Sequence, residues 1–379
     1  MKKKYIIPVC MLLAACSSNE TLHTTDVKPG HSTNVTFSAS IGGSSTSRSK
    51  GEDDYLHNNF IYEEGENGRK SRIRIVNTVN YSAPDFQTVG AYKEYEYNGK
   101  DQDAWEKEEG IINFIAYNEN GFDWDEIRPT AASFVFEAAC YPMEYAYFSN
   151  VATDQTEKEN FWKADLLLAH HAQPLSQRYD LVKLKFHHVF AMIRVTIELP
   201  ISAPQQAGRF PEGAIQKAEL IDMYTGYETE YGEAIPNDGA RTVNGTGEKS
   251  DIQMFPVIEN EHIEGDTEAS LGSQRYVYCA IIPAQSIVNR NIVRFYINTY
   301  TSEFEGDKPV IEEIKYIFKA DESIPLTQGY ITDLELTSGE EETEIIQVKA
   351  TIKEWEPWHT TMPMEPDESE PETPETQTE

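Results

Sequence analysis

Residues 181–199, LVKLKFHHVFAMIRVTIEL, decide the fold class of this chain. Apolar and polar side chains alternate along the segment, which is the pattern of an extended strand with one buried face. The apolar face of the first half carries Val182, Leu184, Phe186, His188 and Phe190, and the opposite face carries Lys183, Lys185 and His187. Beyond Ala191 the parity reverses, so we expect a bulge or bend between His188 and Met192.

The same alternation recurs along most of the chain. Short β-rich runs are bounded by Gly, Pro, Asn and Asp, and only residues 153–169 could hold a short helix. More than a dozen strands exceed one sandwich, so we expect an all-β protein with two antiparallel β-sandwich domains. The Pro- and Gly-rich segment 199–213 is the expected boundary, which gives an N-terminal domain at 51–200 and a C-terminal domain at 201–356.

The N-terminal sequence MKKKYIIPVCMLLAAC combines a basic start, a short apolar run and small residues before Cys16. It resembles the lipobox of bacterial lipoproteins, in which residues 1–15 are a signal peptide and Cys16 is acylated. Ser17 and Ser18 lack the aspartate associated with inner-membrane retention, so the expected location is the outer membrane. The alternative is an ordinary signal peptide with a chance cysteine.

Residues 16–50 divide into a polar tether, a strand and a loop. On the strand, Val35, Phe37, Ala39 and Ile41 form an apolar face. The loop that follows contains Arg48 and no apolar anchor, so we expect a protease to reach it.

The charge balance excludes one class of partner. The chain of 379 residues has 32 basic and 64 acidic side chains, for a formal net charge of -32. Nucleic acid is therefore not expected as a partner, because binding it requires a surplus of Lys and Arg. Residues 357–379 are rich in acids and Pro and poor in apolar side chains, which predicts a disordered tail.

The paired histidines suggest a metal site at first sight. Adjacent residues of a strand point to opposite faces, so neither His170–His171 nor His187–His188 suits one ion, and zinc-type ligand spacing is missing. His188 is better interpreted as a core histidine bonded to the backbone. Cys140 and Cys279 lie in apolar runs, which favours two buried free thiols over a disulfide. Without a catalytic motif or a cofactor motif, we expect neither an enzyme nor a cofactor.

Several segments together resemble the Bacteroidales fimbrillin family, the FimA/Mfa-like pilins, which are made as lipoprotein precursors. The matching positions of its Asp-Leu-Leu-x-Ala and Leu-x-Phe-x-His strands are Asp165, Leu166, Leu167, Ala169, Leu184, Phe186 and His188. The lipobox, the strand before a loop arginine, the run CAIIPAQ and the closing ITDLELT and VKATIKEW segments agree in order.

The resemblance implies two tandem transthyretin-like β-sandwiches and an outer-membrane lipoprotein that assembles into a fimbrium. An arginine-specific protease removes the first strand of such proteins, and a strand of a neighbouring pilin subunit fills the exposed groove. Carried over to this chain, the removable strand is Val35, Phe37, Ala39 and Ile41, and the cleavage residue is Arg48. Arg69 and Arg72 are weaker alternatives, because SRIRIVNTV itself has a strand pattern.

The resemblance leaves the donor strand open. Ile346, Val348, Ala350 and Ile352 form one apolar face, which suits either a donor strand or an ordinary edge strand of the second domain. We expect a structural, tip or accessory pilin whose partners are other pilin subunits, the outer membrane, the protease, and host or bacterial surface ligands. The alternative function is a monomeric surface lipoprotein that binds a glycan or host protein through its loops.

Overall fold

The protein is described by a computed structural model. It describes residues 33–41, 72–78, 90–97, 112–141, 150–203, 210–229, 238–265, 271–287, 291–319, 323–338 and 345–354. This part of the chain is all-β, as the sequence predicts, apart from 3-10 turns and the short helix α2 (Lys158–Lys163). No helix within these ranges has the length and apolar character needed to cross a membrane.

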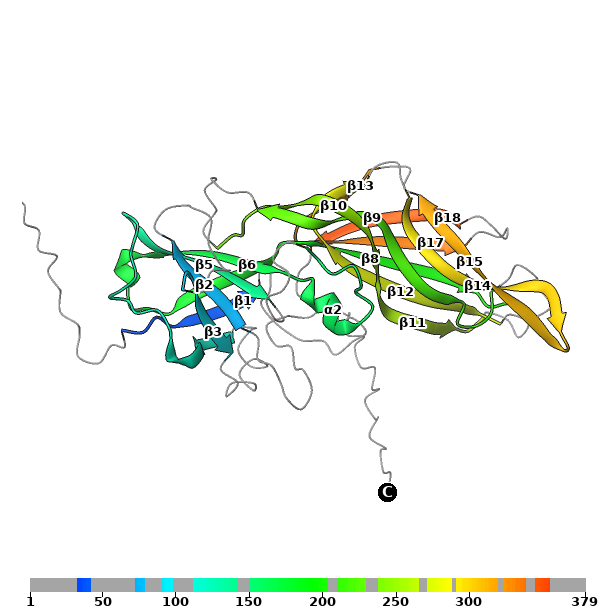
Figure 1. The fold of residues 1–379 in the computed structure, drawn as a ribbon, viewed down its shortest axis with the longest axis horizontal. Helices are drawn as coiled ribbons and strands as arrows, with labels where there is room; N and C mark the ends of the chain where they lie inside the picture. Colours follow the sequence, from blue (N-terminus) through cyan, green and yellow to red (C-terminus); the bar gives the residue numbers. More distant parts are fainter. Residues whose placement is uncertain are drawn as a thin grey trace, which may run out of the picture.

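The first unit is a closed barrel (Figure 1). Its strands, in spatial order, are β1 (Phe37–Ile41), β4 (Ile112–Ala116), β3 (Lys93–Tyr97), β2 (Arg72–Thr78), β5 (Ser133–Tyr141), β6 (Leu167–Pro174) and β7 (Val182–His188). All neighbours are antiparallel except β1 and β7, which run parallel and close the barrel. The expected sandwich is therefore a barrel here, because β1 pairs along both of its edges.

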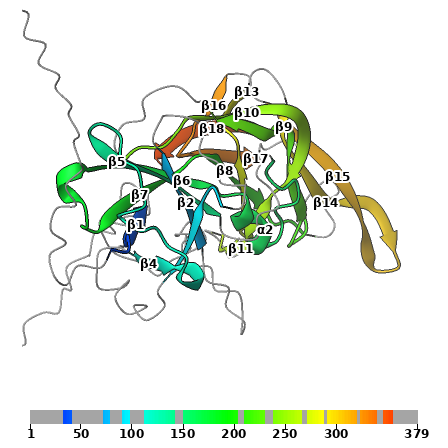
Figure 2. The same ribbon diagram turned by 60° about the vertical axis from the view of Figure 1, so that its left-hand side comes forward.

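The second unit is a pair of sheets. The four-stranded sheet has the order β10 (Val243–Gln253), β9 (Ile215–Thr229), β14 (Asn291–Glu305) and β15 (Lys308–Lys319). The five-stranded sheet has the order β11 (Phe255–Ile263), β12 (Ser273–Ile282), β8 (Ala191–Pro200), β17 (Tyr330–Ser338) and β18 (Ile345–Glu354). A small pair is formed by β13 (Gln285–Ile287) and β16 (Ile324–Leu326). The β14–β15 hairpin extends beyond the rest of this unit (Figure 2).

Strand β8 belongs to the second unit, so the first unit ends before the predicted boundary at residue 200. Ile193, Val195 and Ile197 are fully buried in the core of the second unit, and β8 pairs with β12 and β17. The parity reversal marks the reason: β7 ends at His188 and β8 starts at Ala191, so the chain changes sheets there. Where a bulge or bend was expected, between His188 and Met192, the chain passes from the barrel to the second unit.

Residues 150–163, which precede β6, also contact the second unit. Asn150 bridges to Gly226, and Asp154 bridges to Gln253. Phe161 of α2 is fully buried and stacks on Phe255 with ring centroids 5.0 Å apart. The chain therefore reaches the second unit, returns to the barrel for β6 and β7, and then enters the second unit with β8.

Candidate functional site

Strand β1 is the part of the barrel that the family resemblance predicts to be removable. On one edge it pairs antiparallel with β4, placing Phe37 opposite Phe114. On the other edge it pairs parallel with β7, from Phe37 opposite Val182 to Ile41 opposite Phe186. One short segment thus joins the two ends of the sheet, and without it both flanking strands would be edges.

The inward side chains of this segment fill the centre of the barrel. Val35, Phe37 and Ala39 are all buried, with Phe37 only 1% exposed. The Phe37 ring makes edge contacts with Tyr95 (centroids 4.7 Å apart) and Phe136 (5.3 Å). Burying a Val or Phe side chain contributes about 1.5–3 kcal/mol each, so these contacts contribute roughly 3–6 kcal/mol.

Residues just before β1 are tied to the loop after β4. The Val35 amide donates to the Phe122 carbonyl (2.9 Å), and the Trp124 amide donates to the Thr33 carbonyl (2.8 Å). On the other side, the Val182 amide donates to the Thr36 carbonyl (3.0 Å). The segment 33–41 is therefore held by backbone bonds along its length, which is how an added strand is held in β-augmentation.

Tyr95 contributes a hydroxyl to the side chains that surround Phe37. Its hydroxyl accepts a hydrogen bond from the Phe122 amide at 2.7 Å. Burial raises the pKa of Tyr95 far above its ordinary value, although the bond from Phe122 opposes this rise. The hydroxyl therefore stays neutral, so the pocket presents aromatic surface without a charge.

Of the residues predicted for lipidation and cleavage, the structure describes only Arg72. Cys16, Arg48 and Arg69 lie outside the described residues, as do the signal peptide and the tail 357–379. Arg72 begins β2, with its guanidinium carbon 3.5 Å from the centre of the Tyr117 ring. It pairs with Glu96 and Tyr141 on the two sides of β2, which disfavours cleavage at this position.

The candidate donor strand lies in the other unit. β18 is at the edge of the five-stranded sheet and pairs antiparallel with β17, with Leu334 opposite Ala350. Residues 346–352 therefore occupy an edge strand of their own fold, and the structure does not bring them to β1. A donor role would require a second copy of the chain.

Three histidines of the barrel contact a segment of the second unit: His170, His171 and His187. No cluster of potential metal ligands occurs within the described ranges. His188 is buried, as predicted for a core histidine, and its Nδ1 atom bonds to the Asp165 carboxylate (Nδ1 to Oδ1, 2.9 Å). His187 and His171 both reach Asp238, through its carbonyl oxygen (2.8 Å) and its carboxylate (2.7 Å), respectively.

Asp238 belongs to a segment of the second unit that crosses β5, β6 and β7, which we call the latch (residues 238–241). Arg241 in the latch donates two hydrogen bonds to the buried Glu137 carboxylate of β5. The His170 amide donates to the Gly239 carbonyl at 3.1 Å. The sequence PNDG at 236–239 signals a turn, but nothing in it indicates contact with the barrel.

The two cysteines in the described part of the chain are buried and form no disulfide, as predicted. Cys140 packs in the barrel core and Cys279 in the core of the second unit. Burial raises the pKa of the Cys140 thiol well above its ordinary value, so the thiol stays neutral and unreactive.

Comparison with known proteins gives one family and a set of distant structures. A family model described as fimbrillin-like matches residues 59–355. No curated protein matches the chain. The family match spans most of the chain and includes strands of both units.

Three solved structures illustrate the distant similarity. Candidate cell adhesion proteins from Bacteroides uniformis and Bacteroides ovatus are each 14% identical, with TM-scores of 0.46 and 0.44. The alignments cover 85% and 86% of this chain and 98% of each of those chains. The tip fimbrial protein Mfa3 from Porphyromonas gingivalis with C-terminal truncation is 9% identical, with a TM-score of 0.31 over 85% of this chain and 99% of that chain.

Proposed function

The chain belongs to the fimbrillin-like family, and we propose that it is a pilin subunit that assembles after its first strand is removed. The observation that carries the proposal is the double pairing of β1, whose loss would expose two strand edges and an aromatic pocket. Unpaired backbone groups beside an apolar pocket form an acceptor for an extended segment of another subunit.

Export and cleavage complete the proposal. The lipobox supports acylation at Cys16 and an outer-membrane anchor on the cell surface. Arg48 follows β1 in the sequence, so cleavage after it by an arginine-specific protease would separate the lipid and the first strand from the rest of the chain.

The pattern of β18 matches that of the strand it would replace. The alternating apolar positions of the first strand are Val35, Phe37, Ala39 and Ile41, and those of the last are Ile346, Val348, Ala350 and Ile352. Both have four apolar side chains at alternate positions, with alanine third. We propose that β18 of a second subunit enters the groove in the direction of β1, with Ala350 at the place of Ala39.

The release of β18 from its own sheet requires little of the fold to open. β18 pairs with β17 along one edge only, in the described part of the chain. Its departure would open a single ladder of the five-stranded sheet. The exchange would replace that ladder with two, against β4 and β7 of the acceptor.

Treatment of the full chain with an arginine-specific protease tests the proposal. We expect one cut after Arg48, shown by mass spectrometry, followed by oligomers that resist SDS. The matched controls are Arg48→Lys, which should stay uncut and monomeric, and Arg72→Lys, which should behave as the unsubstituted chain.

A terminal subunit would have the groove but no working donor strand, and it would not form oligomers. A second measurement tests this case. A labelled peptide of residues 345–354 should bind the trimmed chain and not the intact one. A trimmed chain that remains monomeric and takes up no peptide would overturn the proposal and favour the monomeric ligand-binding lipoprotein.

A further inference from the structure

Strand β15 leaves one edge of the four-stranded sheet open. It pairs with β14, and no other described strand pairs with it. The ladder is regular from Val293 opposite Phe318 to Tyr300 opposite Ile311. The segment 311–318 is thus an unbulged edge, and such an edge is a template for another strand.

Three isoleucines are exposed along this edge. Ile311, Ile314 and Ile317 are 49%, 38% and 48% exposed, and they are every isoleucine of the segment 311–318. Because side chains of a strand alternate, Ile311 and Ile317 share one face and Ile314 lies on the other. Edges are protected by proline, bulges or charged side chains, and 311–318 has neither proline nor bulge, while its charged side chains are Glu312, Glu313 and Lys315.

The sequence of the edge is complementary to itself when reversed. If two copies of β15 pair antiparallel about Ile314, Ile311 of each copy lies opposite Ile317 of the other, and Glu313 lies opposite Lys315. The inner face then places Val310 opposite Phe318. Opposite charges and apolar pairs at facing positions are the pairs that stabilise antiparallel strands.

We propose that the β15 edge binds a second copy of this chain through a two-fold antiparallel pairing centred on Ile314. The contact joins the four-stranded sheets of two subunits into one continuous sheet. It uses the same patch on both copies, as a two-fold interface requires. It is independent of strand exchange at β1, because it uses no residue of the barrel.

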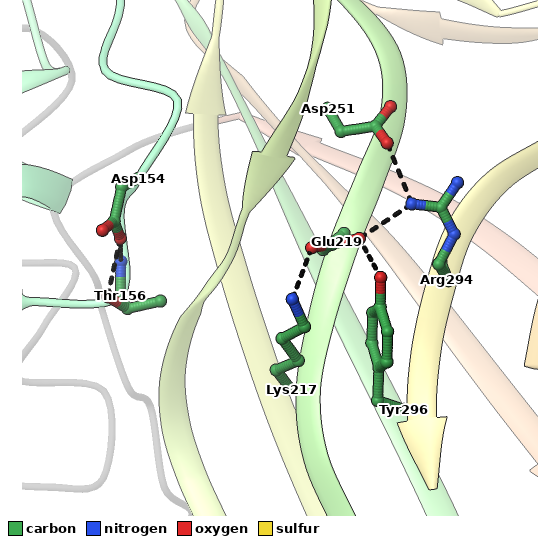
Figure 3. A network of polar contacts seen from close by, with 7 residues as sticks. All are labelled: Asp154, Thr156, Lys217, Glu219, Asp251, Arg294 and Tyr296. Carbon is green, nitrogen blue, oxygen red and sulfur yellow. Dashed lines mark hydrogen bonds and ion pairs between the residues drawn. The ribbon is translucent and has the colours of Figure 1, made fainter. Parts of the chain in front are cut away.

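Strand β14, which pairs with β15, is itself bonded to β9 through side chains. Glu219 on β9 accepts hydrogen bonds from Lys217 (2.8 Å), Arg294 (2.8 Å) and Tyr296 (2.9 Å), so β9 and β14 are cross-linked (Figure 3). Arg294 also donates to Asp251 of β10 at 2.9 Å. Although burial raises it, these bonds together lower the pKa of Glu219, so the network stays charged at neutral pH.

Lys315 on the β15 edge also contacts this network, through the ring of Tyr296. The Lys315 ammonium lies 5.1 Å from the centre of the Tyr296 ring, and the Lys217 ammonium lies 4.2 Å from it. Lys315 is therefore held over the outer face of the sheet, the face that Glu313 shares.

A single pair of edge strands is smaller than a standard protein interface, so the dimer should be weak and depend on concentration. Cysteine cross-linking detects such a contact at its centre. Facing Cα atoms of antiparallel strands lie about 4.5–5.5 Å apart, which a disulfide can bridge. We use the full chain with Cys10→Ser and Cys16→Ser as background, since Cys140 and Cys279 are buried.

In this background, Ile314→Cys should form a disulfide-linked dimer under mild oxidation. Ile311→Cys alone should not, because its partner is position 317, and the Ile311→Cys, Ile317→Cys pair should cross-link again. Equal cross-linking of Ile314→Cys and Ile311→Cys would indicate non-specific aggregation and overturn the proposal. Absence of cross-linking at position 314 would overturn it as well.

A charge exchange keeps the test independent of cysteine. Glu313→Lys places lysine opposite Lys315 twice per dimer, and we expect association about tenfold weaker by analytical ultracentrifugation. The double variant Glu313→Lys, Lys315→Glu restores both opposite-charge pairs and should recover association. If the single and double variants associate as the unsubstituted chain does, the proposed register is overturned.

Discussion

Arg241 and Glu137 form a buried ion pair that joins the second unit to the barrel, although they are 104 positions apart in the sequence. The Arg241 Nε and Nη2 atoms donate to the two carboxylate oxygens at 2.8 and 2.6 Å. Both side chains are at most 5% exposed. The pair therefore fixes the latch on β5 with two charge-assisted bonds in a site closed to water.

We expect Arg241→Met to destabilise the protein by about 3–5 kcal/mol, because it leaves the Glu137 carboxylate buried without its cation. The double variant Arg241→Met, Glu137→Gln should be less destabilised than the single one, since no buried charge is left behind. Urea unfolding measures both. The exposed pair Arg275–Glu261 (3.1 Å) is the control, and Arg275→Met should change stability by less than about 1 kcal/mol.

The latch should also weaken in acid. Burial lowers the pKa of His170, which faces Glu137, Arg241, His171 and Asp238. Burial likewise lowers the pKa of His187, which faces Lys185, His188 and Asp238. Because the unfolded chain binds protons at these positions near pH 6.5 while the folded chain does not, stability contributed by the neutral forms is lost as pH falls below about 6.5.

Urea unfolding between pH 8 and pH 5 checks this dependence. The variants His170→Gln and His187→Gln cannot take up the proton and should each show a smaller loss of stability below about pH 6.5. Gln also keeps an amide donor for the Asp238 carbonyl at position 187. A slope with pH that is the same in all three chains would assign the acid sensitivity to other groups.

Alternation of side chains predicted the elements well and their partners poorly. It placed Val35, Phe37 and Ala39 on one buried face, and all three are core residues of the barrel. It could not predict the parallel pairing of β1 with β7, because periodicity shows which face is buried and not what lies beside the strand. The alternating pattern of β8 is compatible with either unit, and only its pairing with β12 and β17 assigns it to the second.

Strand β1 should contribute strongly to the stability of the barrel. Phe37→Ala removes a ring that contacts Tyr95, Phe122 and Phe136, and we expect a loss of about 3–5 kcal/mol. Thr36→Ala, at an exposed position of the same segment, should cost less than about 1 kcal/mol. Similar unfolding free energies for both variants would mean that β1 is not part of the barrel in solution.

The proposed direction of strand exchange gives the last prediction. In the parallel register, Ala350 of the donor takes the place of Ala39, which is 1% exposed and leaves little room for a larger side chain. We therefore expect the peptide 345–354 with Ala350→Phe to bind the trimmed chain at least tenfold more weakly than the unsubstituted peptide, because overpacking costs about 1–3 kcal/mol. Fluorescence anisotropy measures both affinities. The control is Lys349→Gln, whose side chain lies on the opposite face of an extended peptide and should change affinity little. Should the peptide enter in the reverse direction, position 350 would instead meet the pocket of Phe37, and Ala350→Phe would bind more tightly.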